Sequence, residues 1–144
     1  MSGTSYVVVE VGEDLVGLDV LQVREVLAEQ PLTRVALAPP DVVGLLHLRG
    51  QVVTTLDLRR RLGLAPGVPA GRATDVVVRV GDERVALRAD GVRDVVHVED
   101  ADVEPVADVL PHPLSELARG AVQLPGRLLL LLDVARTASP GAAA

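Results

Sequence analysis

Few residues of this chain have the type and spacing that catalysis requires. The three histidines, His47, His97 and His112, stand far apart, and none belongs to a metal-ligating pattern such as H-E-x-x-H. Ser115 lies in "PLSELA" rather than in a nucleophile elbow, and is expected to cap a turn. The chain contains neither cysteine nor lysine, which excludes thiolate ligands, disulfides and Schiff bases. We therefore expect no catalytic residue, no metal site and no cofactor.

Charged side chains are plentiful, but their positions suggest structural roles. Asp57, Asp90, Asp94 and Asp133 follow or interrupt apolar runs, so we expect strand-end and turn carboxylates rather than a catalytic pair. The run Arg59–Arg61 is expected to be the solvated face of a turn. The formal net charge is −6 and the aromatic content is 1%. An acidic chain with so few aromatic side chains is a poor candidate for binding nucleic acid.

One arginine occupies an unusual place. In "GLLHLRGQVV" (44–53) two apolar runs meet at Arg49-Gly50. Such runs pair as strands, and a two-residue turn between them favours Asn-Gly or Asp-Gly. An arginine at this join is either an exposed turn residue or a residue kept for a function.

The apolar runs predict an all-β protein. Short strand-like runs recur between turn signals, about nine or ten in all, and this spacing is typical of a barrel or a sandwich. The stretch 21–27 is equally compatible with a strand and with a helical turn. Short helical turns are expected after Leu58 and after Asp133, and Asp41 is expected to cap a further turn. No internal repeat is clear from the sequence.

The chain length of 144 residues fits one domain, which we place at residues 5–138, followed by a disordered tail at 139–144. The Pro/Gly/Ala stretch 65–73 is expected to be a boundary between two lobes or an exposed excursion. The acidic, proline-broken stretch 99–118 is expected to be a long loop. We find no signal peptide, and the longest apolar run is too short to span a bilayer.

Four blocks in order make the sequence specific. They are "LVGLDVLQVREVL", "PLTRVALAPPDVVGLLHLRGQVVTTLDLRRRLGL", "RVALRADGVRDVVHV" and "RGAVQLPGRLLLLLDVARTA". Together they resemble the CheW family of chemotaxis coupling proteins, from about Tyr6 to Ala138. The central block, with Leu-Arg-Gly between two apolar strands and Asp-Leu-Arg after them, is the most diagnostic.

The resemblance implies two packed five-stranded, SH3-like β-barrels with short helical turns. It implies a cytoplasmic, non-enzymatic adaptor that is recruited to membrane receptor arrays without inserting into the membrane. The partners it implies are the cytoplasmic tips of chemoreceptors (methyl-accepting chemotaxis proteins) and the regulatory domain of the histidine kinase CheA. A groove between the barrels would hold the helical hairpin of the receptor.

The resemblance also implies roles for single residues. Arg49 would pair with Glu25 beside the receptor groove, as a partly buried ion pair that shapes it. Val23, Val26 and Val95 would contact the receptor. Gly44 would also belong to the receptor-binding positions, because a glycine there would allow the backbone to approach closely. For Val23, Val26, Val95 and Gly44, plain core packing is the rival interpretation.

Two departures from the family pattern leave alternatives open. His47 stands where the family often has Asn, and Thr54 where it often has Pro, so the class of receptor is not defined. One alternative is a CheW-like scaffold of a non-flagellar chemosensory pathway. An alternative from another class is a small β-barrel ligand-binding module, which would need a closed apolar pocket.

Overall fold

The fold is built almost entirely of strands. The computed structural model describes residues 2–65 and 71–139. The strands are β1 (Gly3–Val11), β2 (Asp14–Asp19), β3 (Val23–Ala28), β4 (Leu32–Thr33), β5 (Val42–Leu48), β6 (Gln51–Asp57), β7 (Thr74–Val80), β8 (Glu83–Ala89), β9 (Gly91–Glu99), β10 (Ala118–Leu124) and β11 (Arg127–Leu132). The short helices are η1 (Val20–Gln22), α1 (Leu58–Arg61), η2 (Asp100–Asp102), η3 (Ala107–Val109), α2 (Leu114–Leu117) and α3 (Val134–Thr137).

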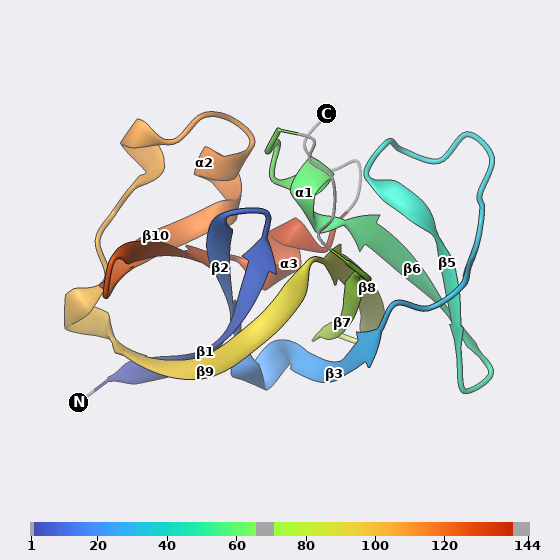
Figure 1. The fold of residues 1–144 in the computed structure, drawn as a ribbon, viewed down its shortest axis with the longest axis horizontal. Coiled ribbons are helices and arrows are strands. Elements are labelled where there is room, and N and C mark those ends of the chain that lie inside the picture. The colour runs from blue at the N-terminus through green and yellow to red at the C-terminus, as the bar shows by residue number, and fades with distance from the viewer. Residues whose placement is uncertain (1, 66–70, 140–144) are drawn as a thin grey trace.

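The strands form two sheets, which define two lobes. Lobe A has the strand order β9-β1-β2-β11-β10, and lobe B has the order β3-β7-β8-β6-β5-β4. Lobe A lies on the left of Figure 1 and lobe B on the right, with α1 and α3 between them. The predicted all-β fold of two packed β units is confirmed. Lobe B carries one strand more than expected, the two-residue β4, and within the described residues no pairing joins the outermost strands of either sheet.

The two lobes are built to the same plan. In each, a hairpin (β1–β2 or β7–β8) pairs in parallel with one strand of a second hairpin (β11 or β6) and antiparallel with an edge strand (β9 or β3). The edge strands are exchanged, because β3 follows β2 in the chain but joins lobe B, and β9 follows β8 but joins lobe A. The chain therefore consists of two equivalent halves that the sequence alone did not reveal.

The core has three parts. The largest cluster lies between the lobes and joins valines of β1 and β2 to aliphatic residues of β7, β8, α1 and α3. A second cluster fills lobe A, around Tyr6 and Leu129. A third, smaller cluster fills lobe B, around Leu46 and Val77. Burial of aliphatic side chains between the lobes fixes their relative placement.

The structure corrects the interpretation of residues 65–73. This stretch is not a lobe boundary, because the strands before and after it, β6 and β7, both belong to lobe B. The chain crosses between lobes at η1 and between β8 and β9 instead. Residues 66–70 of this stretch, and 140–144 of the expected tail, lie outside the described residues.

The ambiguous stretch 21–27 contains both predicted forms, the 3₁₀ turn η1 and then β3. The side chain of Asp19 accepts a hydrogen bond from the backbone N–H of Leu21 (2.9 Å) and so starts this turn. Two other caps were not as expected. Ser115 lies within α2, where it makes no capping hydrogen bond, and no helix follows Asp41.

The two predicted helical turns after β6 and β11 are present, each capped by an aspartate. Asp57 accepts hydrogen bonds from the backbone of α1, and Asp133 does so from α3. The expectation of a solvated arginine face on α1 is wrong for Arg61, whose side chain is buried and donates to the carbonyls of Arg136 and Thr137 (2.8 and 3.0 Å). Arg61 thus satisfies backbone carbonyls at the end of α3.

Candidate functional site

The residues that the resemblance pairs, Glu25 and Arg49, form a bidentate ion pair. Nη1 of Arg49 donates to Oε2 of Glu25 (2.6 Å), and Nη2 donates to Oε1 (2.5 Å). The Glu25 side chain is 22% exposed and that of Arg49 is 66% exposed. The pair therefore links the outer strand β3 to the turn between β5 and β6, with Arg49 accessible to a partner.

The backbone at this turn is unfavourable for arginine. Arg49 has φ 50° and Gly50 has φ 78°, and these two residues connect the paired residues Leu48 and Gln51. Two successive positive φ angles define a type I′ turn, which strongly favours Asn-Gly or Gly-Gly. A left-handed conformation costs a non-glycine residue roughly 1 kcal/mol, so local backbone preference does not explain the arginine.

Electrostatics bind the two side chains together. The hydrogen bond from Arg49, with its positive charge, lowers the pKa of Glu25 below its ordinary value of 4.5, and Arg84 on β8 contributes to the same effect. Glu25 in turn raises the pKa of Arg49. Both groups are therefore charged at neutral pH, and the pair presents donors that a partner's acceptor can approach.

The other half of the chain shows that the fold does not require this ion pair. The turn between β10 and β11 is equivalent to the one at Arg49, and it carries Pro125 and Gly126 there. Gly126 has φ 74°, as the type II turn predicted for Pro-Gly requires. Asp94 is equivalent to Glu25, and it is exposed with no ion-pair partner among the described residues.

The two edge strands carry matching valines. On β3, Val23 and Val26 lie opposite Val78 and Val76 of β7. A β-bulge in between places these two valines, three residues apart, on the face that looks toward the other lobe. β9 has the same bulge, and there the two valines are Val92 and Val95, opposite Val9 and Val7 of β1.

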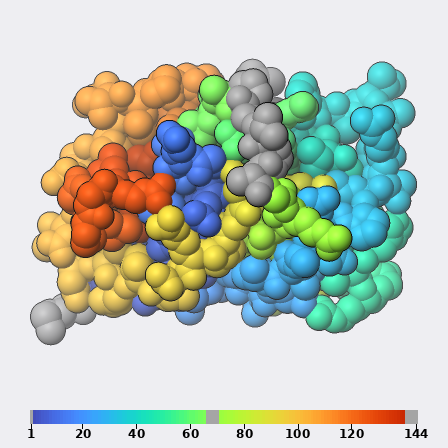
Figure 2. Space-filling view, viewed as in Figure 1, coloured from blue at the N-terminus to red at the C-terminus, as the bar shows by residue number. Residues whose placement is uncertain are grey.

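Val23, Val26, Val92 and Val95 will be called the edge-valine surface. Val23 and Val92 are partly buried against the cluster between the lobes. Val26 is 46% exposed and Val95 is 59% exposed. β9 (yellow) and β3 (light blue) meet on the lower part of the face in Figure 2. Exposed valines beside a shared core offer apolar contacts to a partner.

Gly44, by contrast, serves the fold. A Cβ atom there would lie 2.8 Å from the carbonyl oxygen of Thr33 and 2.9 Å from Cβ of Leu32. Its equivalent in the other half, Gly120, has the same close packing, with a Cβ position 2.5 Å from Val103. Both glycines sit at matching bulges, so the close approach at Gly44 is to strand β4 of its own lobe.

Two further ion pairs were not predicted from the sequence. Asp75 is wholly buried and accepts two hydrogen bonds from Arg88 (2.9 and 3.0 Å), which raise the pKa of Arg88. Asp90, where the chain returns to lobe A, accepts hydrogen bonds from Arg59 (2.9 Å) and from the backbone of Gly12. The second set ties α1 to the β1–β2 turn and holds the two lobes together.

Neither metal binding nor membrane crossing is indicated by residues 2–65 and 71–139. Over these residues, no group of three or more His, Asp or Glu side chains is placed to hold a metal ion. In the same part of the chain, no helix is long and apolar enough to cross a bilayer. The histidines contact single polar neighbours: His47 is within hydrogen-bond distance of the Thr33 hydroxyl (3.2 Å), and the other two lie near Glu99 and Glu116.

Comparison with known proteins gives a consistent result. The family model described as "CheW-like domain" matches residues 5–140. The chain is 30% identical to "Chemotaxis protein CheW" of Rhizobium meliloti over 132 residues, which cover 92% of this chain and 85% of that one. It is 29% identical to "Chemotaxis protein CheW" of Klebsiella aerogenes over 138 residues, covering 95% and 82%.

A solved structure supports the fold. The crystal structure of scaffolding protein TtCheW from Thermoanaerobacter tengcongensis superposes with a TM-score of 0.82 at 21% identity, covering 92% of this chain and 90% of that one. The family consists of chemotaxis scaffold proteins rather than enzymes. Its two lobes exchange their edge strands, and the family model matches nearly its whole length. This chain therefore belongs to the CheW family.

Proposed function

We propose that this protein is an adaptor that couples the cytoplasmic tips of chemoreceptors to the histidine kinase CheA. In this role it works in the cytoplasm, next to receptor arrays in the membrane. The receptor helix lies along the edge-valine surface, and Arg49 with Glu25 borders it. The regulatory domain of CheA binds elsewhere on the lobes.

The observation that carries the proposal is the difference between the two halves. Both halves have the bulged edge strand and its two valines, but only one has the ion pair. The equivalent turn folds with Pro125-Gly126 and needs no arginine. An arginine kept in a left-handed conformation, which the fold could avoid, is best explained by contact with a partner.

The edge-valine surface suits a helix as its occupant. A helix that docks on a protein presents an apolar stripe with three- and four-residue spacing. Val26 and Val95 are the exposed members on the two edge strands, and the accessible guanidinium of Arg49 can donate hydrogen bonds to a polar group at the margin of the stripe.

An adaptor needs surface for a second protein as well. Further large apolar side chains outside the edge-valine surface are exposed, among them Leu37, in the loop before β5, and Val109, in η3. Leu37 is fully exposed with φ 61°, a conformation that is rare for a bulky residue. These positions leave apolar contacts available to a kinase domain while a receptor helix is bound.

The alternatives predict different findings. A ligand-binding module needs a closed apolar pocket, whereas two open hollows over the described residues have charged side chains in their lining, among them Arg84 in one and Arg88 in the other. A non-flagellar chemosensory scaffold would share every feature above. That case is distinguished from the flagellar one by the cellular response that the kinase of the same pathway controls.

Calorimetric titration tests the proposal directly. The purified protein is titrated with the regulatory domain of a CheA kinase from the same genome, and separately with a soluble cytoplasmic fragment of a chemoreceptor. We expect micromolar or tighter binding to the kinase domain. We also expect Arg49→Gly to keep the fold, because glycine suits a type I′ turn, while weakening receptor binding and receptor-dependent kinase control.

Arg119→Gly is the control. Arg119 is exposed on β10, an outermost strand of the lobe A sheet, so this variant removes an exposed arginine from the other lobe. Kinase-domain binding that fails in every CheA tested would overturn the adaptor role. Receptor coupling that survives in Arg49→Gly would show that the ion pair is a turn feature only.

A further inference from the structure

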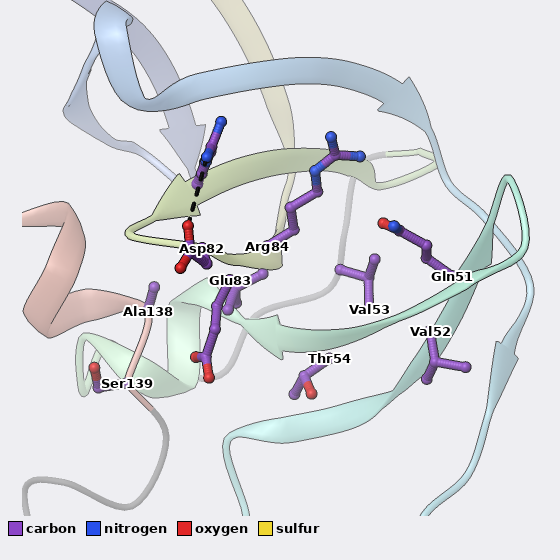
Figure 3. Close-up of a pocket in the computed structure, with 11 residues that line it drawn as sticks. Gln51, Val52, Val53, Thr54, Asp82, Glu83, Arg84, Ala138 and Ser139 are labelled. Carbon is purple, nitrogen blue, oxygen red and sulfur yellow. Dashed lines mark ion pairs between the residues drawn. The ribbon is translucent and has the colours of Figure 1, made fainter.

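Arg84, on β8, is an arginine close to the ion pair that has no partner of its own. Its side chain is exposed and makes neither a hydrogen bond nor an ion pair with residues 2–65 and 71–139. It lines a hollow of about 880 Å³ between the first residues of β6 and the tip of the β7–β8 hairpin (Figure 3). The guanidinium of Arg84 therefore has room to move toward a carboxylate within its reach.

The strand register places Arg84 on the same face of lobe B as Glu25. Glu25 lies opposite Val77 of β7, and Val77 lies opposite Ala86 of β8. Arg84 is two residues before Ala86, so its side chain leaves β8 on that face. In Figure 3 Arg84 extends to the same side as Val53, which belongs with Val77 to the cluster that fills lobe B. Arg84 therefore faces Glu25 and not the edge-valine surface.

The spacing of the strands lets Arg84 reach Glu25. Their Cα atoms are two strands and two residues apart, which corresponds to about 12 Å for strands about 4.8 Å apart that rise about 3.4 Å per residue. An extended arginine and an extended glutamate, joined by a hydrogen bond, span more than this. The pKa of Glu25 is lowered first by its hydrogen bond from Arg49 and then by the charges of Arg49 and Arg84.

Lobe A lacks both arginines. Leu15 stands there at the place of Arg84, and Pro125 at the place of Arg49. The carboxylate equivalent to Glu25 has no ion-pair partner in the described part of that lobe. The two arginines thus occur together, in the lobe whose edge-strand carboxylate is paired.

Contact between Arg49 and a receptor leaves Glu25 in need of a new partner. Arg49 uses both ends of its guanidinium on the two carboxylate oxygens of Glu25, so a turn of Arg49 toward a receptor removes both hydrogen bonds. The side chain of Glu25 is only 22% exposed, and a shielded charge that loses its partner is costly. A second guanidinium within reach lowers that cost.

We propose that Arg84 is the alternative partner of Glu25: it takes over the carboxylate when Arg49 turns to the receptor, and it is therefore a positioning residue for Arg49. This inference rests on the proposed receptor-binding function. Arg84 does not touch the receptor and acts through Glu25. A guanidinium suits this exchange because it binds a carboxylate through two parallel hydrogen bonds.

The first measurement needs no partner. NMR titration gives the pKa of Glu25 in Arg49→Gly, in which glycine suits the turn, and in Arg49→Gly/Arg84→Gln. We expect a lower pKa in the single variant, because Arg84 binds the carboxylate when Arg49 is absent. Arg49→Gly/Arg119→Gln removes an equal charge from lobe A and should match the single variant. Equal pKa values in all three variants would overturn the role of Arg84.

The second measurement is calorimetric titration with a soluble cytoplasmic fragment of a chemoreceptor. Arg84→Gln should weaken binding by about two- to fivefold, the range of an exposed charge pair, and Arg84→Lys should recover part of the loss. In a Glu25→Gln background, Arg84→Gln should change nothing, because the carboxylate on which Arg84 acts is absent. An equal loss in both backgrounds would mean that Arg84 acts by another route, and the proposal would be wrong.

The two proposals fail in different ways. If the wild-type protein binds the receptor fragment and Arg84→Gln binds equally well, the role of Arg84 is overturned and the adaptor role stands. If the wild-type protein binds no receptor fragment, both are overturned.

Discussion

The ion pair between Asp75 and Arg88 should be the most costly one in the fold to break. Asp75 is fully buried on β7, and Arg88 lies directly opposite on β8 with its side chain 20% exposed. Arg88 donates twice to Asp75 and once to the carbonyl of Gln30 (2.8 Å). Arg88→Met keeps the aliphatic stem and removes all three donors.

The size of the loss follows from what Asp75 retains. In Arg88→Met the carboxylate keeps one hydrogen bond, from the backbone N–H of Gln30 (2.9 Å). Removing one partner of a buried pair typically destabilises a protein by about 3–5 kcal/mol. Since Arg88 reaches solvent, water can partly replace it, and we expect about 3 kcal/mol. That is a large part of the roughly 5–15 kcal/mol that holds a domain together.

Urea unfolding, followed by circular dichroism, measures this loss. The double variant Asp75→Val/Arg88→Leu removes both charges and should be within about 1 kcal/mol of the wild type, because well-packed apolar residues often replace a buried pair without loss. Together with the single variants Asp75→Val and Arg88→Leu, the double variant forms a mutant cycle. A loss under about 1 kcal/mol for Arg88→Met, or a double variant as unstable as the single one, would refute the reasoning.

Three other predictions concern the site. NMR titration should place the pKa of Glu25 below 4.5; the stability that its ion pair adds is then present above pH 4.5 and is lost as the pH falls through the lowered value. Val26→Asp should abolish receptor binding, whereas Leu128→Asp, at a side chain equally exposed (45% against 46%) but on lobe A, should bind normally. Gly44→Ala should lower the free energy of unfolding by about 1–3 kcal/mol, measured in urea, because its Cβ would meet the carbonyl oxygen of Thr33 at 2.8 Å; an unchanged midpoint would show that β4 can move away.

The strands were predictable because the local signals agree. Val-rich runs, the Pro-Gly turn and the Arg-Gly turn each mark hairpins that the structure contains. The register of the β7–β8 hairpin also follows from its two-residue turn at Gly81-Asp82, and that register places Asp75 opposite Arg88. The sequence thus contained a signal for this ion pair in the length of the hairpin turn.

The exchange of edge strands was not predictable in the same way. Val23-Arg24-Glu25-Val26 and Val92-Arg93-Asp94-Val95 are similar, but four residues are too few to establish a repeat. Their equivalence depends on pairing with strands far away in the sequence, β7 and β1. Burial of Arg61 was equally hidden, since its partners are carbonyls of α3, 75 and 76 residues further along.

The two halves allow the demands of the fold to be separated from those of function within one chain. Positions that agree between halves, such as Gly44 and Gly120 or the aspartates that cap α1 and α3, are explained by packing and by backbone hydrogen bonds. Two of the positions that differ carry an arginine in lobe B: Arg49 in place of Pro125, and Arg84 in place of Leu15. Both differences lie at the same end of lobe B and surround Glu25. Because lobe A folds on the same plan without them, the stability of the fold does not account for these charges, and the proposed receptor contact would give Arg49 its role.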